Sequence, residues 1–208
     1  YNPNKETSPN NLSEGFGDDT RTTLDLTLNY DKQFGVHGFK FLGGYHAERY
    51  HYHGLSAYRK NFPGNELTDM NAGEAATATN GGYSRDLNML SYFARVNYDL
   101  MGRYLFEANV RADASSRFAK GNRWGYFPSF SAAWRISEES FMENTKDWLN
   151  YLKIRGSWGL LGNQDALKDY YPAVNTYNIG GVSNFNGKPN TGYYQGSYKQ
   201  TTISWEKA

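Results

Sequence analysis

One pair of histidines is the only arrangement in this sequence that suggests metal chemistry. His51 and His53 are separated by one residue in the motif HYH, so in an extended chain both imidazoles lie on one face and could bind one metal ion. His46 has the opposite parity, and no firm third ligand is evident, whereas protein metal sites commonly take about three or four protein ligands. We therefore interpret HYH as an aromatic-rich strand end and predict no metal site.

The residue patterns that support catalysis are also missing. Asp18 and Asp19 are adjacent, as are Glu138 and Glu139, so in an extended chain the two carboxylates of each pair point apart. The sequence has no cysteine, which removes thiolate nucleophiles and disulfides. The segment GLLGNQ at 159–164 has too few glycines and no lysine for a phosphate-binding loop. We predict a protein without enzymatic activity and without a cofactor.

The composition indicates a β protein rich in aromatic side chains. The 208 residues include 18 Tyr, 12 Phe, 5 Trp and 22 Gly, which is typical of strands joined by turns rather than of disorder. A formal charge of +1 argues against nucleic acid as a partner. No segment approaches the roughly 18 consecutive apolar residues of a membrane helix, which leaves barrel strands possible because they are half polar.

Alternating apolar and polar side chains predict about six strands. The clearest runs are 90–100 and 104–114, which flank a turn at Met101 and Gly102, and in the first run only Phe93 breaks the alternation. Comparable runs begin near residues 21, 39, 128 and 152. They reach about ten or eleven residues, the length of a tilted strand that crosses a bilayer, whereas soluble strands average about five or six. Short connections alternate with long loops, which we place at about 1–20, 54–88, 115–126 and 162–200.

The two faces of these strands favour a membrane barrel. Aromatic residues gather near the strand ends, as in the two girdles of such a barrel: Tyr30, Tyr98, Tyr104, Tyr151, Trp124, Tyr126, Phe127 and Trp158. Charges of both signs occupy the other face and would suit a wet or plugged lumen: Arg95, Glu107, Arg111, Asp113, Arg135, Lys153 and Arg155. A soluble carbohydrate-binding β-sandwich remains an alternative. It would bury Leu90, Tyr92, Val96, Phe106, Val110 and Trp134 in a core.

The sequence between about residues 88 and 172, roughly two fifths of the chain, closely resembles a known family. It reads SYFARVNYDLMGRYLFEANVRADASSRFAKGNRWGYFPSFSAAWRISEESFM and then WLNYLKIRGSWGLLGNQ. The ordered pieces SYF, NYD, SSRF, RWG, FPS, AWRIS and SWG together resemble the barrel region of the SusC/RagA family of TonB-dependent outer-membrane transporters. Ala94 and Ala114 depart from the pattern, where glycine is more frequent in the family.

The resemblance implies a fold, a location and partners. The fold would be an all-β, antiparallel transmembrane barrel of about 22 strands, filled by a plug, of which residues 1–208 supply about six strands. The location would be the bacterial outer membrane, surrounded by lipid. Partners would be a SusD-like surface lipoprotein that acts as a lid, and the TonB complex, which acts on a plug that this sequence does not contain. The substrate would be an oligosaccharide or, as second choice, an oligopeptide. A passive porin or a structural barrel remains the alternative function.

Three further expectations concern the ends and the site residues. The sequence starts at Tyr1 without Met or a signal peptide, and ISWEKA at its end resembles the start of a strand, so we expect a piece of a longer protein. Contacts with the ligand or lid are expected from Tyr170, Tyr171, Tyr177, Tyr193, Tyr194 and Tyr198, because flat amphipathic rings bind sugars and protein surfaces. The charged residues of the polar face are expected to meet the plug.

Overall fold

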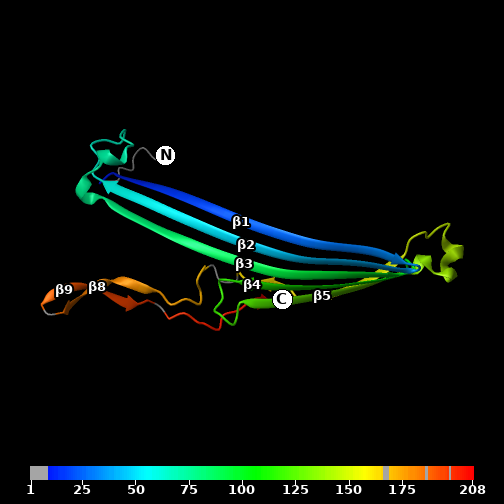
Figure 1. Cartoon of the computed structure of the whole chain (residues 1–208). Coiled ribbons are helices and arrows are strands. Elements are labelled where there is room, and N and C mark those ends of the chain that lie inside the picture. The colour runs from blue at the N-terminus through cyan, green and yellow to red at the C-terminus, as the bar shows by residue number, and fades with distance from the viewer. Residues whose placement is uncertain (1–8, 166–168, 186, 197) are drawn as a thin grey trace. The chain divides into compact units, whose positions relative to one another are not determined.

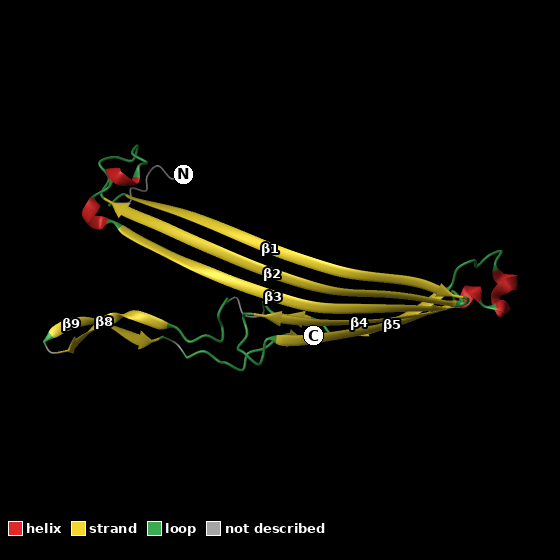
Figure 2. Cartoon of the chain, in the orientation of Figure 1, coloured by secondary structure: helices red, strands yellow, loops and turns green. Residues whose placement is uncertain are grey.

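The computed structural model describes residues 9–165, 169–185, 187–196 and 198–208, and its main feature is a six-stranded sheet in chain order (Figures 1 and 2). Its strands are β1 (Asn11–Phe34), β2 (His37–Lys60), β3 (Thr79–Leu100), β4 (Tyr104–Ser115), β5 (Trp124–Arg135) and β6 (Lys153–Gly159). Each strand is hydrogen-bonded to the next, which is an up-and-down arrangement. The predicted number of strands is confirmed.

The other described elements are short. β7 (Gly162–Asn163) pairs with β10 (Glu206–Lys207), and β8 (Tyr177–Phe185) pairs with β9 (Lys188–Gln195). Short 3-10 helices lie at Met70–Ala72, Ala75–Thr77, Ile136–Glu138 and Ser140–Thr145. Within the described ranges, no helix combines the length and the apolar character needed to cross a membrane.

The chain divides into two compact units, and the smaller one contains the residues up to Thr22 together with Arg49–Asp86. Here the loop between β2 and β3 folds against the start of β1. The Asn10 side chain accepts a hydrogen bond from the Phe62 N–H (2.9 Å) and donates one to the Phe62 carbonyl (3.0 Å). Phe62 is buried, and its ring packs on Gly73. Side-chain hydrogen bonds thus fix a loop that has little regular structure of its own.

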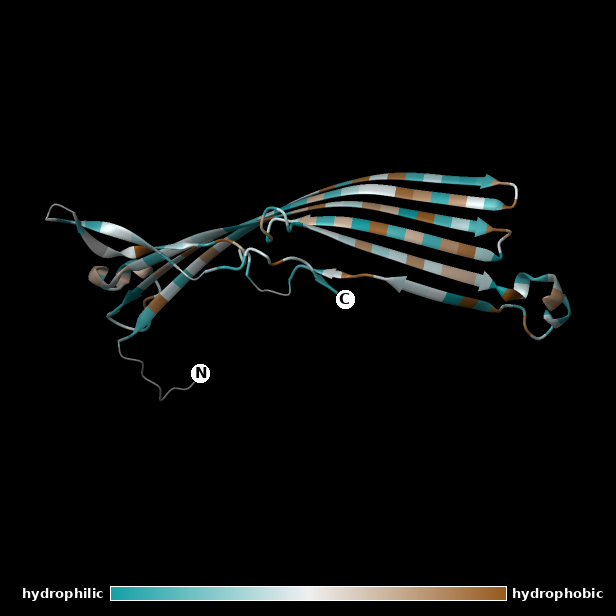
Figure 3. Ribbon diagram, turned by 90° about the horizontal axis from the view of Figure 1, so that it is seen from below, coloured by the Kyte–Doolittle hydropathy of each residue, from teal (hydrophilic) through white to brown (hydrophobic). Residues whose placement is uncertain are grey.

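The larger unit contains Thr23–Glu48 and Leu87–Ala208, and its strand register separates an apolar face from a polar face. Tyr98, Phe106 and Ala132 are direct cross-strand neighbours on the apolar face. One residue further, Asn97, Glu107 and Ser131 are neighbours and point to the polar face. Figure 3 shows the resulting alternation of hydrophilic and hydrophobic residues along the strands. The alternation predicted from the sequence is confirmed here.

The apolar face is exposed rather than packed into a core. Tyr92 and Phe106 are about half exposed, at 51% and 50%, and Trp134 retains 39% of its surface. Stacked ring pairs run across the strands instead, such as Tyr104 on Trp134 with centroids 6.4 Å apart. No described segment covers these rings as the second sheet of a sandwich would. The buried core that the sandwich alternative requires is therefore not formed by these residues.

Tight turns join the strands at one end of the larger unit. Met101 and Gly102 both have positive φ values, 58° and 68°, as the two central residues of a type I′ turn require, and the Arg103 N–H closes this turn on the Leu100 carbonyl at 3.0 Å. The Asp99 carboxylate accepts the Gly102 N–H at 2.6 Å. The Met101 N–H donates to the Val36 carbonyl at 2.8 Å, which joins this turn to the β1–β2 turn. The turn predicted at Met101 and Gly102 is confirmed.

The strands extend well beyond the alternating runs. Residues 11–20, 54–60, 79–88 and 124–126, which the sequence analysis assigned to loops, all belong to strands. The segment 162–200, assigned to one long loop, contains β7 and the β8–β9 hairpin. In β1, β2 and β3 the physical reason is that backbone pairing needs no continuous apolar face, so a strand can continue where polar residues interrupt that face. In β5, Trp124 and Tyr126 do lie on the apolar face, opposite Ala114 and Ala112. Alternation marks only the part of each strand with one apolar face.

The described residues form one small buried cluster in the larger unit. Phe118, Phe127 and Trp205 pack together there, and Ile203 lies against them. The Phe127 ring occupies the space above two glycines, Gly125 and Gly162, where any Cβ atom would overlap it. Because Gly162 has no side chain, β7 can lie directly against the Phe127 ring of β5.

We expect Gly162→Ala to lower the free energy of unfolding by about 1–3 kcal/mol, because the new methyl group overlaps the Phe127 ring in a packed cluster. Gly156→Ala is the matched control, since a Cβ there meets no atom within 4 Å. Gly156→Ala should change the free energy of unfolding by no more than about 0.5 kcal/mol. Chemical denaturation of the intact protein measures both. Equal destabilisation by the two variants would contradict the packing of Phe127 on Gly162.

Candidate functional surfaces

The polar face of β3 and β4 carries two neighbouring hydrogen-bonded groups of charged and polar side chains. Arg111 binds the Asp113 carboxylate, with its Nε 2.7 Å from Oδ1, and donates to Ser91 Oγ at 3.0 Å. Asp113 and Ser91 are both buried. Nearby, Arg95 Nε donates to the side-chain carbonyl of Asn109 at 2.6 Å, and Asn109 donates to Glu107 at 3.0 Å. Four of the seven predicted lumen residues therefore lie in neighbouring hydrogen-bonded groups.

The remaining predicted lumen residues lie toward β6. Lys153 is the direct cross-strand neighbour of Arg135. Lys153 and Arg155 line a concavity of about 530 Å³ on this face, together with Asp99 and Glu107. Arg135 Nε is buried and has no hydrogen-bond partner within the part of the chain that the structure describes.

Phe93, the exception to the sequence alternation, has a structural explanation. Its ring lies on the polar face over Gly44 of β2, where a Cβ atom would overlap it. The Arg111 guanidinium lies 5.9 Å from the centre of the same ring. An aromatic ring that covers a glycine of the neighbouring strand stabilises that pairing. Phe93 therefore belongs to the packing of the polar face.

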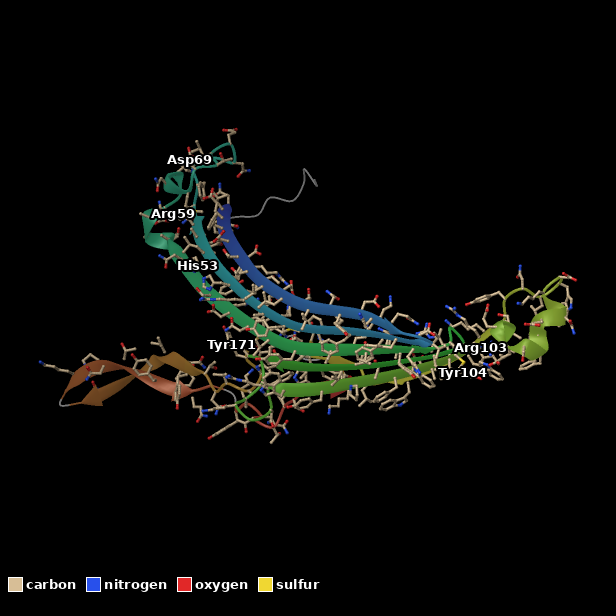
Figure 4. All side chains as sticks on the ribbon, turned by 45° about the vertical axis from the view of Figure 1, so that its right-hand side comes forward. His53, Arg59, Asp69, Arg103, Tyr104 and Tyr171 are labelled. Atoms are coloured by element: carbon tan, nitrogen blue, oxygen red, sulfur yellow. The ribbon has the colours of Figure 1, made fainter. Side chains whose placement is uncertain are left out.

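A buried carboxylate lies where β5 enters the connector to β6. Glu139 Oε1 accepts hydrogen bonds from the Tyr104 hydroxyl (2.7 Å) and from Trp134 Nε1 (2.9 Å), and Oε2 accepts one from Arg103 at 3.2 Å. Figure 4 shows Arg103 and Tyr104 beside this connector. The hydrogen bond from Tyr104 is the main cause that lowers the pKa of Glu139, followed by those from Trp134 and the charge of Arg103. The sequence analysis missed this site, since it treated Glu139 only as a neighbour of Glu138.

A second ionic cluster ties the segment after β7 to the end of β4. Arg117, whose side chain is 8% exposed, binds the Asp165 carboxylate at 2.9 Å and donates to the Asp169 carbonyl at 3.3 Å. Its guanidinium also lies 4.9 Å from the centre of the Tyr170 ring. Lys199 binds the Asp169 carboxylate at 2.7 Å. This hydrogen bond is the main cause that lowers the pKa of Asp169, with a second contribution from the Tyr171 N–H.

The six tyrosines predicted to contact a ligand or lid fall into separate settings. Tyr170 and Tyr171 are partly buried beside the Arg117 cluster, so neither is a free loop ring. On the β8–β9 hairpin, Ile179 and Tyr193 are direct cross-strand neighbours and Tyr177 lies two residues away on the same face. These three are 68–72% exposed. Tyr194 points to the other face of the hairpin, and Tyr198 is exposed after it.

The histidines make separate contacts with neighbouring strands. His51 Nδ1 lies 2.9 Å from Asp86 Oδ1, and His53 Nδ1 lies 3.0 Å from Ser84 Oγ. His46 pairs with Asp25 at 2.6 Å. Across the residues that the structure describes, no group of three or more His, Asp or Glu side chains is arranged to hold a metal ion.

Comparison with known proteins identifies similar sequences among TonB-dependent receptors. TonB-dependent receptor P3 of Formosa agariphila is 34% identical over 145 residues, which cover 69% of this chain and 14% of that receptor. TonB-dependent receptor SusC of Bacteroides thetaiotaomicron is 34% identical over 165 residues, which cover 77% of this chain and 16% of that receptor. The chain thus spans about a sixth or less of the length of these relatives. No family model matches the sequence.

Comparison of structures gives the fold. The structure of the RagAB peptide transporter superposes with a TM-score of 0.83 and 24% sequence identity, and covers 99% of this chain and 22% of that chain. The RagAB peptide importer in its closed-closed state superposes with a TM-score of 0.82 at the same identity and the same shares of both chains. The predicted fold class is confirmed: the sheet is part of an antiparallel β-barrel.

Proposed function

Because this chain belongs to the SusC/RagA family of TonB-dependent receptors, we propose that it forms part of the barrel wall of an active nutrient importer in the bacterial outer membrane. The two-sided sheet carries this proposal. One face presents exposed rings and aliphatic side chains, and the other holds a network of charges. A membrane barrel requires an apolar outer band and accepts charge only toward its lumen. Residues 1–208 would then all belong to the barrel domain.

The polar face would line the lumen and hold the plug. Two concavities on this face, of about 730 and 530 Å³, are lined by side chains of both charge signs. TonB would act on that plug, because energy from the inner membrane must reach the substrate path through the lumen. The chain itself would supply contacts and no covalent chemistry.

The connections opposite the tight turns would face the cell exterior. They are the 61–78 loop, the 116–123 loop and the segment from Leu160 to Trp205, which includes the β8–β9 hairpin. The exposed hairpin face of Tyr177, Ile179 and Tyr193 would contact the SusD-like surface lipoprotein or the substrate held beneath it. An oligosaccharide is the first substrate class, because flat rings stack on sugars. The RagAB relative is a peptide importer, which supports an oligopeptide as the second.

Energy dependence separates an importer from a passive pore. Cells that express the intact receptor would be given fluorescently labelled oligosaccharides and, separately, labelled oligopeptides, with and without a functional TonB protein. We expect uptake of one class to require TonB. Uptake that is unchanged without TonB would indicate the passive porin and overturn the proposal.

For the hairpin, we expect the double change Tyr177→Ala and Tyr193→Ala to weaken binding of the surface lipoprotein by about tenfold or more, because exposed aromatic residues often dominate interface energies. Tyr194→Ala is the matched control, since this ring points to the opposite face of the hairpin. Titration of the purified lipoprotein against the intact receptor measures both. Equal effects from the two variants would exclude a role for this hairpin face.

A further inference from the structure

The connection between β5 and β6 differs from the other connections at the tight-turn end. Two residues join β1 to β2 and three join β3 to β4, whereas the whole segment 136–152 separates β5 from β6. We call this segment the β5–β6 connector. It begins beside the β3–β4 turn, because the Arg135 N–H donates to the Arg103 carbonyl at 2.8 Å. Membrane barrels usually have short turns at this end, so the connector is longer than chain reversal requires.

The connector is an ordered projection with hydrogen bonds of its own. At its base, the Ser137 N–H donates to the Leu152 carbonyl at 3.2 Å. Further out, the Met142 N–H donates to the Glu139 carbonyl at 3.0 Å, and the Thr145 hydroxyl donates to the Met142 carbonyl at 2.7 Å. The buried Glu139 carboxylate, held by its three donors, fixes the connector to β4 and β5. A surface that is ordered before binding loses less entropy when a partner arrives.

The connector presents aromatic rings to its surroundings. Phe141, Trp148 and Tyr151 are 64%, 76% and 58% exposed. The aliphatic Leu149 and the thioether of Met142 are partly buried instead. Aromatic residues are enriched in protein interfaces, and Trp and Tyr are among the residues that most often dominate the binding energy there. The connector therefore has the apolar residues of a protein-binding surface.

The exposed charges of the connector are mainly negative. Glu138, Glu143 and Asp147 are exposed, and within residues 136–152 Lys146 is the one basic side chain. Anionic lipids attract basic segments, so this charge disfavours a membrane surface as the partner. Opposite charges across an interface steer association and select the partner. A protein with a basic surface is therefore the partner that the connector fits best.

We propose that the β5–β6 connector is a docking surface for the periplasmic domain of TonB, an inference that rests on the proposed function. The proposed orientation of the barrel places the tight-turn end in the periplasm. TonB, which gives the related receptors their name, is the protein that must reach this end to act on the plug. A basic face of TonB would meet Glu143 and Asp147, and its apolar surface would cover Phe141 and Trp148. This contact would hold TonB at the barrel rim, separately from its contact with the plug.

The first test removes the rings. The intact receptor, in phosphatidylethanolamine nanodiscs, is titrated with the purified periplasmic domain of TonB from the same organism. We expect Phe141→Ala together with Trp148→Ala to weaken binding by about tenfold or more, because exposed rings often dominate interface energies. Both side chains are exposed, so the variant should remain folded. Tyr198→Ala is the control, since it removes a ring that is 85% exposed in the segment assigned to the cell exterior.

The second test reverses the charge. Glu143→Lys together with Asp147→Lys should weaken binding several-fold and make it less sensitive to added salt, because salt screens exposed charges. Glu66→Lys together with Asp69→Lys makes the same change of net charge in the 61–78 loop, where both acids are also exposed. This control should bind TonB as the native receptor does.

A label on the connector distinguishes protein from membrane as its cover. An environment-sensitive dye on Trp148→Cys should shift its emission to the blue when the TonB domain is added. A dye that is already buried in lipid, and does not respond to TonB, would show that the membrane covers the connector and would overturn the proposal.

The remaining outcomes separate this proposal from the proposed function. Native binding by both connector variants, in a receptor whose uptake still requires TonB, would overturn the docking surface and leave the importer intact. Uptake that does not require TonB would overturn the proposed function and this inference together.

Discussion

Trp205→Ala is expected to lower the free energy of unfolding by about 3–5 kcal/mol, the usual cost of removing a large buried ring. Trp205 is 8% exposed, and its ring packs on Phe118 and Phe127 with centroids 5.5 and 5.4 Å apart. Its Nε1 also donates to the Arg123 carbonyl at 2.7 Å. The truncation would leave a cavity and remove one of the two hydrogen bonds that the Arg123 carbonyl accepts, the other coming from the Ser115 N–H. Urea unfolding of the intact receptor, followed by its fluorescence, measures the loss.

Two further substitutions separate the components of this effect. Trp205→Phe retains a ring but loses the hydrogen bond to Arg123, so its expected cost is smaller, about 1 kcal/mol from the bond with some loss of packing. Trp148→Ala makes the same chemical change as Trp205→Ala at a side chain that is 76% exposed, and should cost less than about 1 kcal/mol. Similar losses at Trp148 and Trp205 would show that the cluster around Trp205 does not stabilise the fold.

The two faces of the sheet could be predicted from the sequence because successive side chains of a strand point to opposite faces, so an apolar face appears as every second residue. Val96, Tyr98 and Leu100 alternate with Arg95, Asn97 and Asp99, and this pattern holds wherever one face is apolar. The turn at Met101 was predictable from Gly102 between two such runs. The strand ends were not predictable, because residues such as 11–20 pair through their backbones although only Leu12 and Phe16 among them are large and apolar.

The contacts that define the candidate sites could not be predicted, because each joins distant parts of the sequence. Trp205 and Arg123 are 82 residues apart, and Tyr104 and Glu139 are 35 apart. Nothing in the local sequence distinguishes Glu139 from Glu138, although the first is buried among three donors and the second is exposed. Phe93 is similar: its place on the polar face depends on Gly44 of another strand. The pattern of one sequence shows which residues share a face of a strand, but it does not show which residues of other strands lie beside them.

Glu139→Gln is expected to reduce stability at neutral pH by the next largest amount. The amide keeps the size of the carboxylate and one oxygen, but it loses the negative charge that accepts hydrogen bonds from Tyr104, Trp134 and Arg103. The side chain is 11% exposed, so water does not easily replace that charge. Glu138→Gln is the matched control, since the Glu138 side chain is exposed and should tolerate the change. Urea unfolding at pH 7 should show a clearly lower free energy of unfolding for Glu139→Gln and no clear change for Glu138→Gln.

The pH dependence provides the sharper test of this site. The pKa of Glu139 is lower in the folded chain than its ordinary value of 4.5, chiefly because the Tyr104 hydroxyl donates to the carboxylate. A lowered pKa means that the stabilisation is fully present above about pH 4.5 and is lost as the pH falls through the folded-state pKa. Glutamine does not titrate, so the stability gap between the native receptor and Glu139→Gln should narrow as the solution is acidified below pH 4.5. A gap that stays constant across this range would show that shape, and not charge, is what Tyr104, Trp134 and Arg103 require at this position.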